Sequence, residues 1–94
     1  MIREDGGRLY VSGPITLRTA MTLLDAMAGH IGRESKVVDF SNVSDVDSSA
    51  VSLMLEWSRR ARAAGGSVRF ACAGEAITSL TNLYGVESLI AFED

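Results

Sequence analysis

The spacing of apolar residues along the chain predicts alternating strands and helices. Residues 8–12 alternate between apolar and polar side chains, which is typical of a half-buried strand, and Gly13-Pro14 marks its end. Between Thr16 and His30, apolar residues recur every three or four positions, as they do on one face of a helix. The stripe predicted for this helix consists of Leu17, Met21, Leu24, Met27 or Ala28, and Ile31.

The middle of the chain predicts a second strand followed by a second helix. Residues 36–40 are short and rich in β-branched side chains, as in a buried central strand. A polar segment, 41–49, follows it. A helix is expected from about Ser48 to Ala64, with arginines in its last turns and Gly65-Gly66 after its end. Its predicted stripe is Val51, Met54, Leu55, Trp57 or Ser58, and Ala61.

The last third of the chain completes a repeating order of elements. Residues 67–72 alternate and predict a third strand, and a third helix is expected from about residue 75 to 83 or 84. Residues 86–92 are expected to close the chain as a short helical turn or strand. The order β-α-β-α-β-α predicts an α/β fold, with a small mixed β-sheet and helices packed against it. The first six or seven residues and the last two are expected to be frayed.

Length and charge narrow the classes of function. Ninety-four residues fit one domain, 1–94, with its core at about residues 8–92. Nine basic and twelve acidic residues give a net charge of −3, which argues against nucleic-acid binding. The charged N-terminus lacks the apolar run of a signal peptide, and no segment approaches the roughly 20 apolar residues that span a bilayer. We therefore expect a cytoplasmic protein without direct membrane insertion.

Few side chains suit catalysis or cofactor binding. Cys72 and His30 are the sole cysteine and histidine, so they cannot form a zinc site of the usual kind. Glycine pairs lack the spacing of a phosphate-binding loop. Cys72 is expected to be a small buried hydrophobe, and Met21, Met27 and Met54 are expected to fill the core. No enzyme activity, metal or cofactor is therefore expected.

The candidate functional residues are Asp45, Asp47, Ser48 and Ser49, where the central strand meets the second helix. One interpretation is that Asp47 or Ser48 only caps that helix. The other is that the helix start is a functional surface, because α/β folds gather ligands at the carboxyl ends of strands. Phosphorylation of Ser48 would add roughly −1.5 to −2 charge beside the two aspartates. A Ser-His pair is not expected, because His30 should lie at the opposite pole from this junction.

Two further features remain open to more than one interpretation. Trp57 is either a partly exposed interface residue or part of the core, because the helical phase is uncertain by one residue. The arginines at 59, 60 and 62 form either a solvated helix end or a site for an acidic surface.

The segment VVDFSNVSDVDSSAVSLMLEWSRRARAAGGSVRF resembles the STAS domain, the fold of bacterial anti-sigma factor antagonists. Asp39-Phe40-Ser41 and Asp47-Ser48-Ser49-Ala50 occupy the places of two family motifs. Ala50 stands where the family usually has glycine, and its Cβ is expected to crowd a closely approaching kinase or partner. The resemblance extends from about Leu9 to Phe92, and the ending ITSLTNLYGVESLI is similar to that of MlaB-type STAS subunits of the Mla phospholipid transporter.

This resemblance implies a non-enzymatic adaptor that binds the MlaF-type ABC ATPase and supports its assembly and ATPase activity. Through the ATPase and its permease, the adaptor would lie peripheral to the inner membrane of a Gram-negative cell. The alternative that it implies is an anti-sigma factor antagonist, which binds a serine-kinase anti-sigma factor and is switched by phosphorylation of Ser48. The residues expected to bind the partner are Ser48, Asp45, Asp47, Ser49, Ser52 and Glu56.

Overall fold

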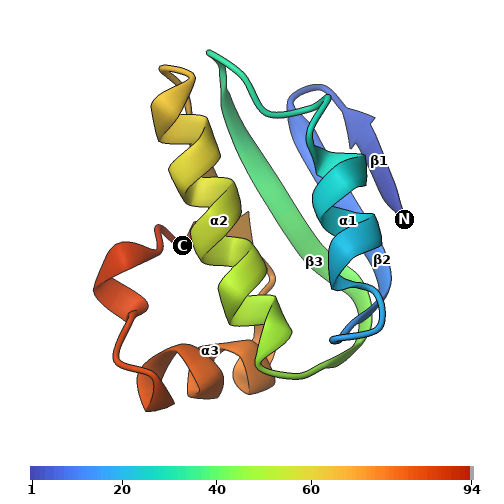
Figure 1. The fold of residues 1–94 in the computed structure, drawn as a ribbon, viewed down its shortest axis with the longest axis vertical. Helices are drawn as coiled ribbons and strands as arrows, with labels where there is room; N and C mark the ends of the chain where they lie inside the picture. Colours follow the sequence, from blue (N-terminus) through green and yellow to red (C-terminus); the bar gives the residue numbers. More distant parts are fainter. Residues whose placement is uncertain (94) are drawn as a thin grey trace.

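The computed structural model describes residues 1–93, which form a four-stranded mixed sheet in the order β1-β2-β3-β4. The elements are β1 (Ile2–Asp5), β2 (Arg8–Ile15), α1 (Ala20–Met27), β3 (Ser35–Val46), α2 (Ser49–Ala63), β4 (Ser67–Ala71), α3 (Gly74–Leu83) and a short 3-10 helix, η1 (Glu87–Leu89). Helices α1 and α2 lie side by side on one face of the sheet, and α3 lies at the end where α2 begins (Figure 1). The predicted α/β fold is confirmed.

The N-terminal residues form an edge strand, so the prediction that they are frayed is wrong. Strand β1 pairs antiparallel with β2, from Ile2 opposite Val11 to Asp5 opposite Arg8. Gly6-Gly7 makes the two-residue turn between them, and both glycines have the positive φ that such a tight hairpin requires. At the other end of the chain, Glu93 is paired as well, because its N–H donates to the carbonyl of Phe70 at 2.9 Å. Residue 94 lies outside the described residues.

Strands β2 and β3 both run further than predicted. They are parallel, and their pairing continues past Gly13-Pro14 as far as Ile15 opposite Val46. The pairing has two register shifts, and the second, between Gly13 and Ile15, falls at Pro14, which has no N–H to donate to the ladder. Residues 41–46 were expected to be a polar connection. They form a strand because long-range pairing with β2 outweighs the low strand propensity of Ser, Asn and Asp.

The core lies between the sheet and helices α1 and α2. Trp57 is fully buried in it, which decides between the two interpretations of this residue. Its indole Nε1 has no hydrogen-bond partner within residues 1–93. Met27 and Met54 are also buried, as predicted. The other large side chains of the core include Leu9, Val11, Ile15, Leu23, Val38, Phe40, Phe70 and Ile77.

Helix α1 is shorter than predicted and presents a different face to the core. Leu23 and Met27 are buried, whereas Leu17 and Met21 are 79% and 69% exposed. The prediction that Leu17 and Met21 are core residues is therefore wrong. Residues 16–19 precede the helix as a turn, which Thr19 stabilises by accepting the Thr16 N–H at 3.0 Å.

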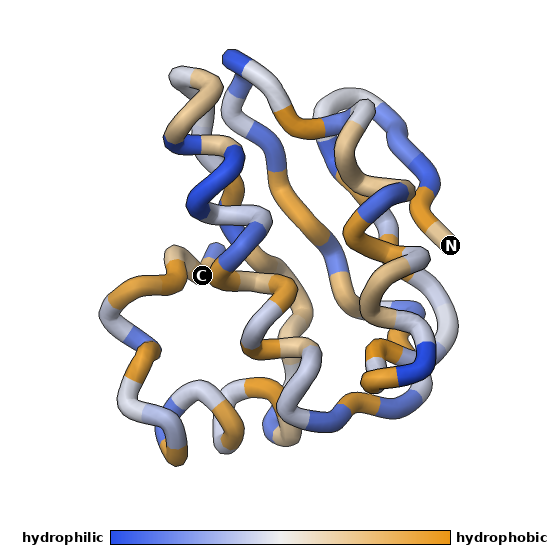
Figure 2. The backbone as a smooth tube through the Cα atoms, viewed as in Figure 1, coloured by the Kyte–Doolittle hydropathy of each residue, from blue (hydrophilic) through white to orange (hydrophobic). Residues whose placement is uncertain are grey.

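Helices α2 and α3 begin and end close to the predicted residues. The C-terminal half of α2 is hydrophilic (Figure 2) and carries the three arginines. Cys72, which was predicted to be buried, is exposed and has a left-handed φ of 56° in the connection to α3. None of the helices formed by residues 1–93 is long and apolar enough to cross a membrane.

Candidate functional site

The connections that follow the three parallel strands meet at one end of the molecule. They are residues 16–19, 47–48 and 72–73, and this end is the lower one in Figure 1. The connection from α1 to β3, which contains His30, lies at the upper end. There the Nδ1 of His30 lies 2.7 Å from the Oε1 of Glu4. The Oε2 of Glu4 accepts a hydrogen bond from the Nζ of Lys36. His30 is therefore placed away from Ser48, as expected.

Asp47 is the residue that caps helix α2. Its Oδ1 accepts the backbone N–H of Ser49 at 2.8 Å, and its Oδ2 accepts the backbone N–H of Leu17 at 3.0 Å. The two N–H groups stabilise the carboxylate and hold the pKa of Asp47 below its usual value. The capping interpretation is therefore correct for Asp47, and the same carboxylate also ties α2 to the connection before α1.

Ser48 occupies the N-cap position but does not use its side chain as a cap. Its backbone is helical, with φ −61° and ψ −18°, and its hydroxyl makes no capping hydrogen bond within the described structure. The carbonyl of Ser48 accepts the N–H of Val51 at 3.2 Å. Ser48 is exposed. The capping interpretation therefore applies to Asp47. Ser48, the next residue, presents its hydroxyl at the surface.

Glu56 was expected to be an exposed residue of α2, but its side chain is half-buried. Arg59 and Arg60 both contact it, and each places a guanidinium nitrogen 2.7 Å from its Oε2. These two arginines lower the pKa of Glu56 to about 2. The cluster of Glu56, Arg59 and Arg60 therefore has a net charge of +1. The three arginines of α2 were expected either to be solvated or to bind an acidic surface, and two of them are paired with Glu56 instead.

An apolar groove runs between α1 and α2, beside Ser48. We call it the α1–α2 groove; its volume is about 280 Å³. Its lining residues are Leu17, Ala20, Met21, Leu24, Ser49, Ser52, Leu53 and Glu56. The groove thus brings together three of the predicted site residues, Ser49, Ser52 and Glu56, along one side of α2.

The sequence interpretation missed Leu17 and Met21 as surface residues. The sequence does contain a sign of their exposure, because this segment has more apolar residues at helical spacing than one buried face needs. Residues 20, 23 and 27 follow that spacing, and so do residues 17, 21 and 24. A helix packed against a sheet on one side cannot bury both sets. Part of this wide apolar stripe had to be exposed, and the sequence alone does not say which part.

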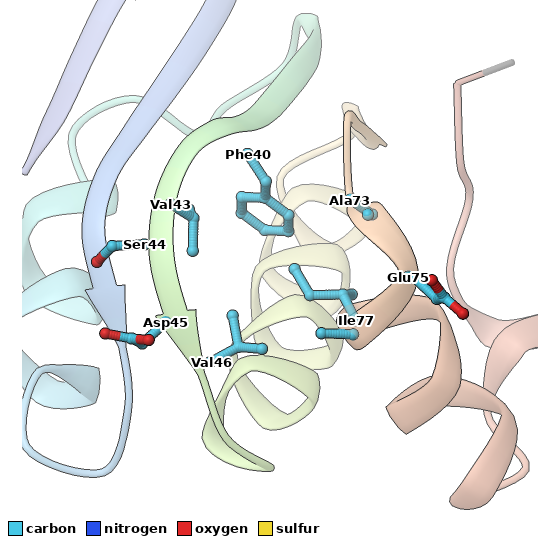
Figure 3. Close-up of a pocket in the computed structure, with 10 residues that line it drawn as sticks. Phe40, Val43, Ser44, Asp45, Val46, Ala73, Glu75 and Ile77 are labelled. Atoms are coloured by element: carbon cyan, nitrogen blue, oxygen red, sulfur yellow. The ribbon is translucent and has the colours of Figure 1, made fainter.

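A second hollow lies on the other side of the α2 start, between β3 and α3. Its volume is about 350 Å³. Phe40, Val43 and Ile77 project into it, whereas the carboxylates of Asp45 and Glu75 turn away (Figure 3). Asp45 therefore does not share a site with the residues of the groove. Within residues 1–93, no group of three or more His, Cys, Asp or Glu side chains is placed to hold a metal ion.

The comparison with protein families identifies this arrangement of elements. Residues 2–91 match the family model described as "Mlab, STAS domain". The chain belongs to the STAS domain family. STAS domains are typically non-enzymatic binding and regulatory modules that mediate protein–protein interactions, for example with anti-sigma factor kinases. No curated protein sequence matches this STAS domain.

Solved structures share its fold. The anti-sigma factor antagonist SpoIIAA in its unphosphorylated form is 14% identical, with a TM-score of 0.70, and the match covers 100% of this chain and 86% of that one. A putative anti-sigma factor antagonist from Thermotoga maritima is 11% identical, with a TM-score of 0.80 and coverages of 100% and 85%. A sulfate transporter family protein from Wolinella succinogenes is 15% identical, with a TM-score of 0.68 and coverages of 93% and 75%. At such identities the likeness shows the fold alone.

Proposed function

We propose that this STAS domain is a non-enzymatic adaptor that docks on the ABC ATPase of a phospholipid transport system of the Mla type. The adaptor is cytoplasmic and reaches the inner membrane only through the ATPase and its permease. Support comes from the MlaB description of the matching family model. The observation that carries the proposal is the exposed Ser48, whose hydroxyl is not engaged in capping and whose neighbour in the sequence, Ser49, lines an apolar groove.

The adaptor acts by binding and needs no chemistry of its own. Asp47 holds the start of α2 and the connection before α1 in one geometry, so the docking surface is formed before the partner arrives. A preformed surface loses little conformational entropy on binding. An adaptor that binds the assembled ATPase better than its separated subunits shifts the equilibrium toward the assembled, active form.

Co-purification with the ATPase tests this function. Ser48→Arg places a long cation on the docking surface, and we expect it to abolish co-purification and the stimulation of ATP hydrolysis. Ser88→Arg is the matched control, because Ser88 is an exposed serine in η1. Fluorescence of the single tryptophan, Trp57, reports whether each variant is folded, since this residue is fully buried. Binding and ATPase activity that survive Ser48→Arg would contradict the proposal.

A second candidate function is that of an anti-sigma factor antagonist switched by phosphorylation of Ser48. Ala50, which replaces the usual glycine, does not oppose it. Its side chain is 1% exposed and belongs to the core, so its Cβ cannot crowd a kinase as the sequence suggested. Incubation with a cognate kinase-type anti-sigma factor and ATP separates the two functions. A phosphopeptide that contains Ser48 favours the switch, and an unmodified chain favours the transporter adaptor.

A further inference from the structure

The α1–α2 groove has features of a preformed binding site rather than of a gap in the surface. Leu17 and Met21 form one wall and are mostly exposed, although both are large and apolar. Leu53, two serines and Glu56 of α2 line the other wall, and most of the surface inside the groove is apolar. Exposed aliphatic side chains that border a recess commonly mark a surface that a partner covers. Neither side chain contributes to the core, so folding does not explain their hydrophobicity.

Asp47 fixes the distance between the two walls. It accepts one N–H from Leu17, on the α1 side, and one from Ser49, on the α2 side. The carboxylate therefore connects both walls at the end of the groove nearest Ser48. Asp47 is the positioning residue of the groove, and its lowered pKa keeps it ionised near neutral pH.

The two ends of the groove carry opposite charge. The ionised Asp47 lies at the end next to Ser48. Glu56 lines the groove further along α2, and the two arginines that follow it on the helix, Arg59 and Arg60, give this cluster a net charge of +1 although they are not lining residues themselves. Apolar walls between charges of opposite sign favour a ligand that carries the complementary pattern.

We propose that the α1–α2 groove binds a short segment of a partner protein that presents an aliphatic anchor between a basic and an acidic residue. The basic residue faces Asp47, and the acidic residue faces Arg59 and Arg60. This inference rests on the proposed docking function, because it names the chemistry that the partner must offer beside Ser48. A second copy of this chain and a fatty acid are the competing occupants.

Selection from a random-peptide display library tests the groove directly and does not require the partner to be identified first. The bait is the full chain, and the Leu17→Ser/Met21→Ser variant is the comparison. Both substitutions are at exposed positions and should leave the fold intact. Leu89→Ser is the matched control, since Leu89 is 60% exposed and does not line the groove.

We expect the selected peptides to carry an aliphatic residue between basic and acidic residues. Leu17→Ser/Met21→Ser should weaken their binding by roughly tenfold or more, and Leu89→Ser should leave it unchanged. A selection that yields no binders, or binders that Leu17→Ser/Met21→Ser does not weaken, would overturn the inference. So would dimers in sedimentation that Leu17→Ser/Met21→Ser dissociates, or laurate that displaces the selected peptides from the wild-type chain.

Binding to the ATPase separates failure of the groove from failure of the proposed function. If the wild-type chain binds the ATPase and Leu17→Ser/Met21→Ser binds equally well, the groove inference is wrong and the adaptor function stands. If the wild-type chain does not bind the ATPase, the adaptor function is wrong, and the peptide selection still decides the chemistry of the groove.

Discussion

The carboxylate of Asp47 accepts the backbone N–H of Leu17 at 3.0 Å, across 30 positions of the sequence. This bond attaches the connection before α1 to the first turn of α2. The side chain of Ser48, which follows Asp47, is thereby left out of the capping interaction. A motif that would otherwise only cap a helix thus also builds one end of a surface.

Replacing Asp47 should therefore cost stability and docking together. We expect Asp47→Ala to lower the Tm by roughly 4–8 °C, the scale of losing one helix cap in a domain of this size. The melting curve can be followed by circular dichroism. Asp45→Ala is the matched control, because it removes an exposed carboxylate two positions away. Equal Tm values for the two variants would show that the bonds of Asp47 contribute nothing.

Asp47 and Glu56, two of the four carboxylates whose pKa is lowered in the folded chain, predict a loss of stability in acid. Backbone N–H groups lower the pKa of Asp47, and two arginines lower that of Glu56 to about 2, from 4.5. A pKa that is lower in the folded than in the unfolded state stabilises the protein above the unfolded pKa, and this stabilisation is lost as the pH falls through the folded value. The Tm should therefore fall between about pH 4.5 and pH 2. Asp47→Asn/Glu56→Gln should show a shallower fall, and a slope equal to that of the wild type would contradict this explanation.

The two methionines of α1 should respond in opposite ways to truncation. Met27 is fully buried, so Met27→Ala should reduce the free energy of unfolding by about 2–5 kcal/mol. Met21 is 69% exposed, and Met21→Ala should change it by no more than about 0.5 kcal/mol. Urea denaturation measures both values. Similar losses for the two variants would mean that α1 packs on the sheet with a different face.

Gly66 should tolerate a side chain less well than its neighbour Gly65. A Cβ at Gly66 would lie 2.1 Å from the carbonyl oxygen of Gly32 and 2.6 Å from that of Glu34, so backbone would have to move. We expect Gly66→Ala to cost about 3 kcal/mol. Gly65 has a φ of 88° and open space around it, so Gly65→Ala should cost only about 1 kcal/mol, from the left-handed conformation. The order of the two unfolding free energies is the test.

Cys72 should be replaceable by glycine but not by valine. Its φ of 56° is a conformation that β-branched residues strongly disfavour. Cys72→Val should be less stable than Cys72→Gly by about 1 kcal/mol or more in urea denaturation. Equal stabilities would show that the connection between β4 and α3 relaxes at no cost.

Local patterns were sufficient to predict the order of the elements from β2 onward and the extent of α2. Its stripe from Val51 to Ala61 has one apolar face, and glycines follow its end. Strand β1 was missed because Ile2–Asp5 has a single apolar residue followed by three charged ones. The signal that would have found it was Gly6-Gly7 directly before an alternating strand, which favours a hairpin.

The sequence by itself determined the STAS family and the α/β fold class, and it predicted a candidate site at the start of α2. These depend on local periodicity, capping residues and a contiguous motif. The tertiary structure decided which face of α1 is buried, that β3 extends to Val46, and that Asp47 binds Leu17. All three depend on how distant segments pack and pair. Helical spacing gives α1 one wide apolar stripe, and only its packing against the sheet decides that the edge with Met21 is exposed, together with Leu17 before the helix.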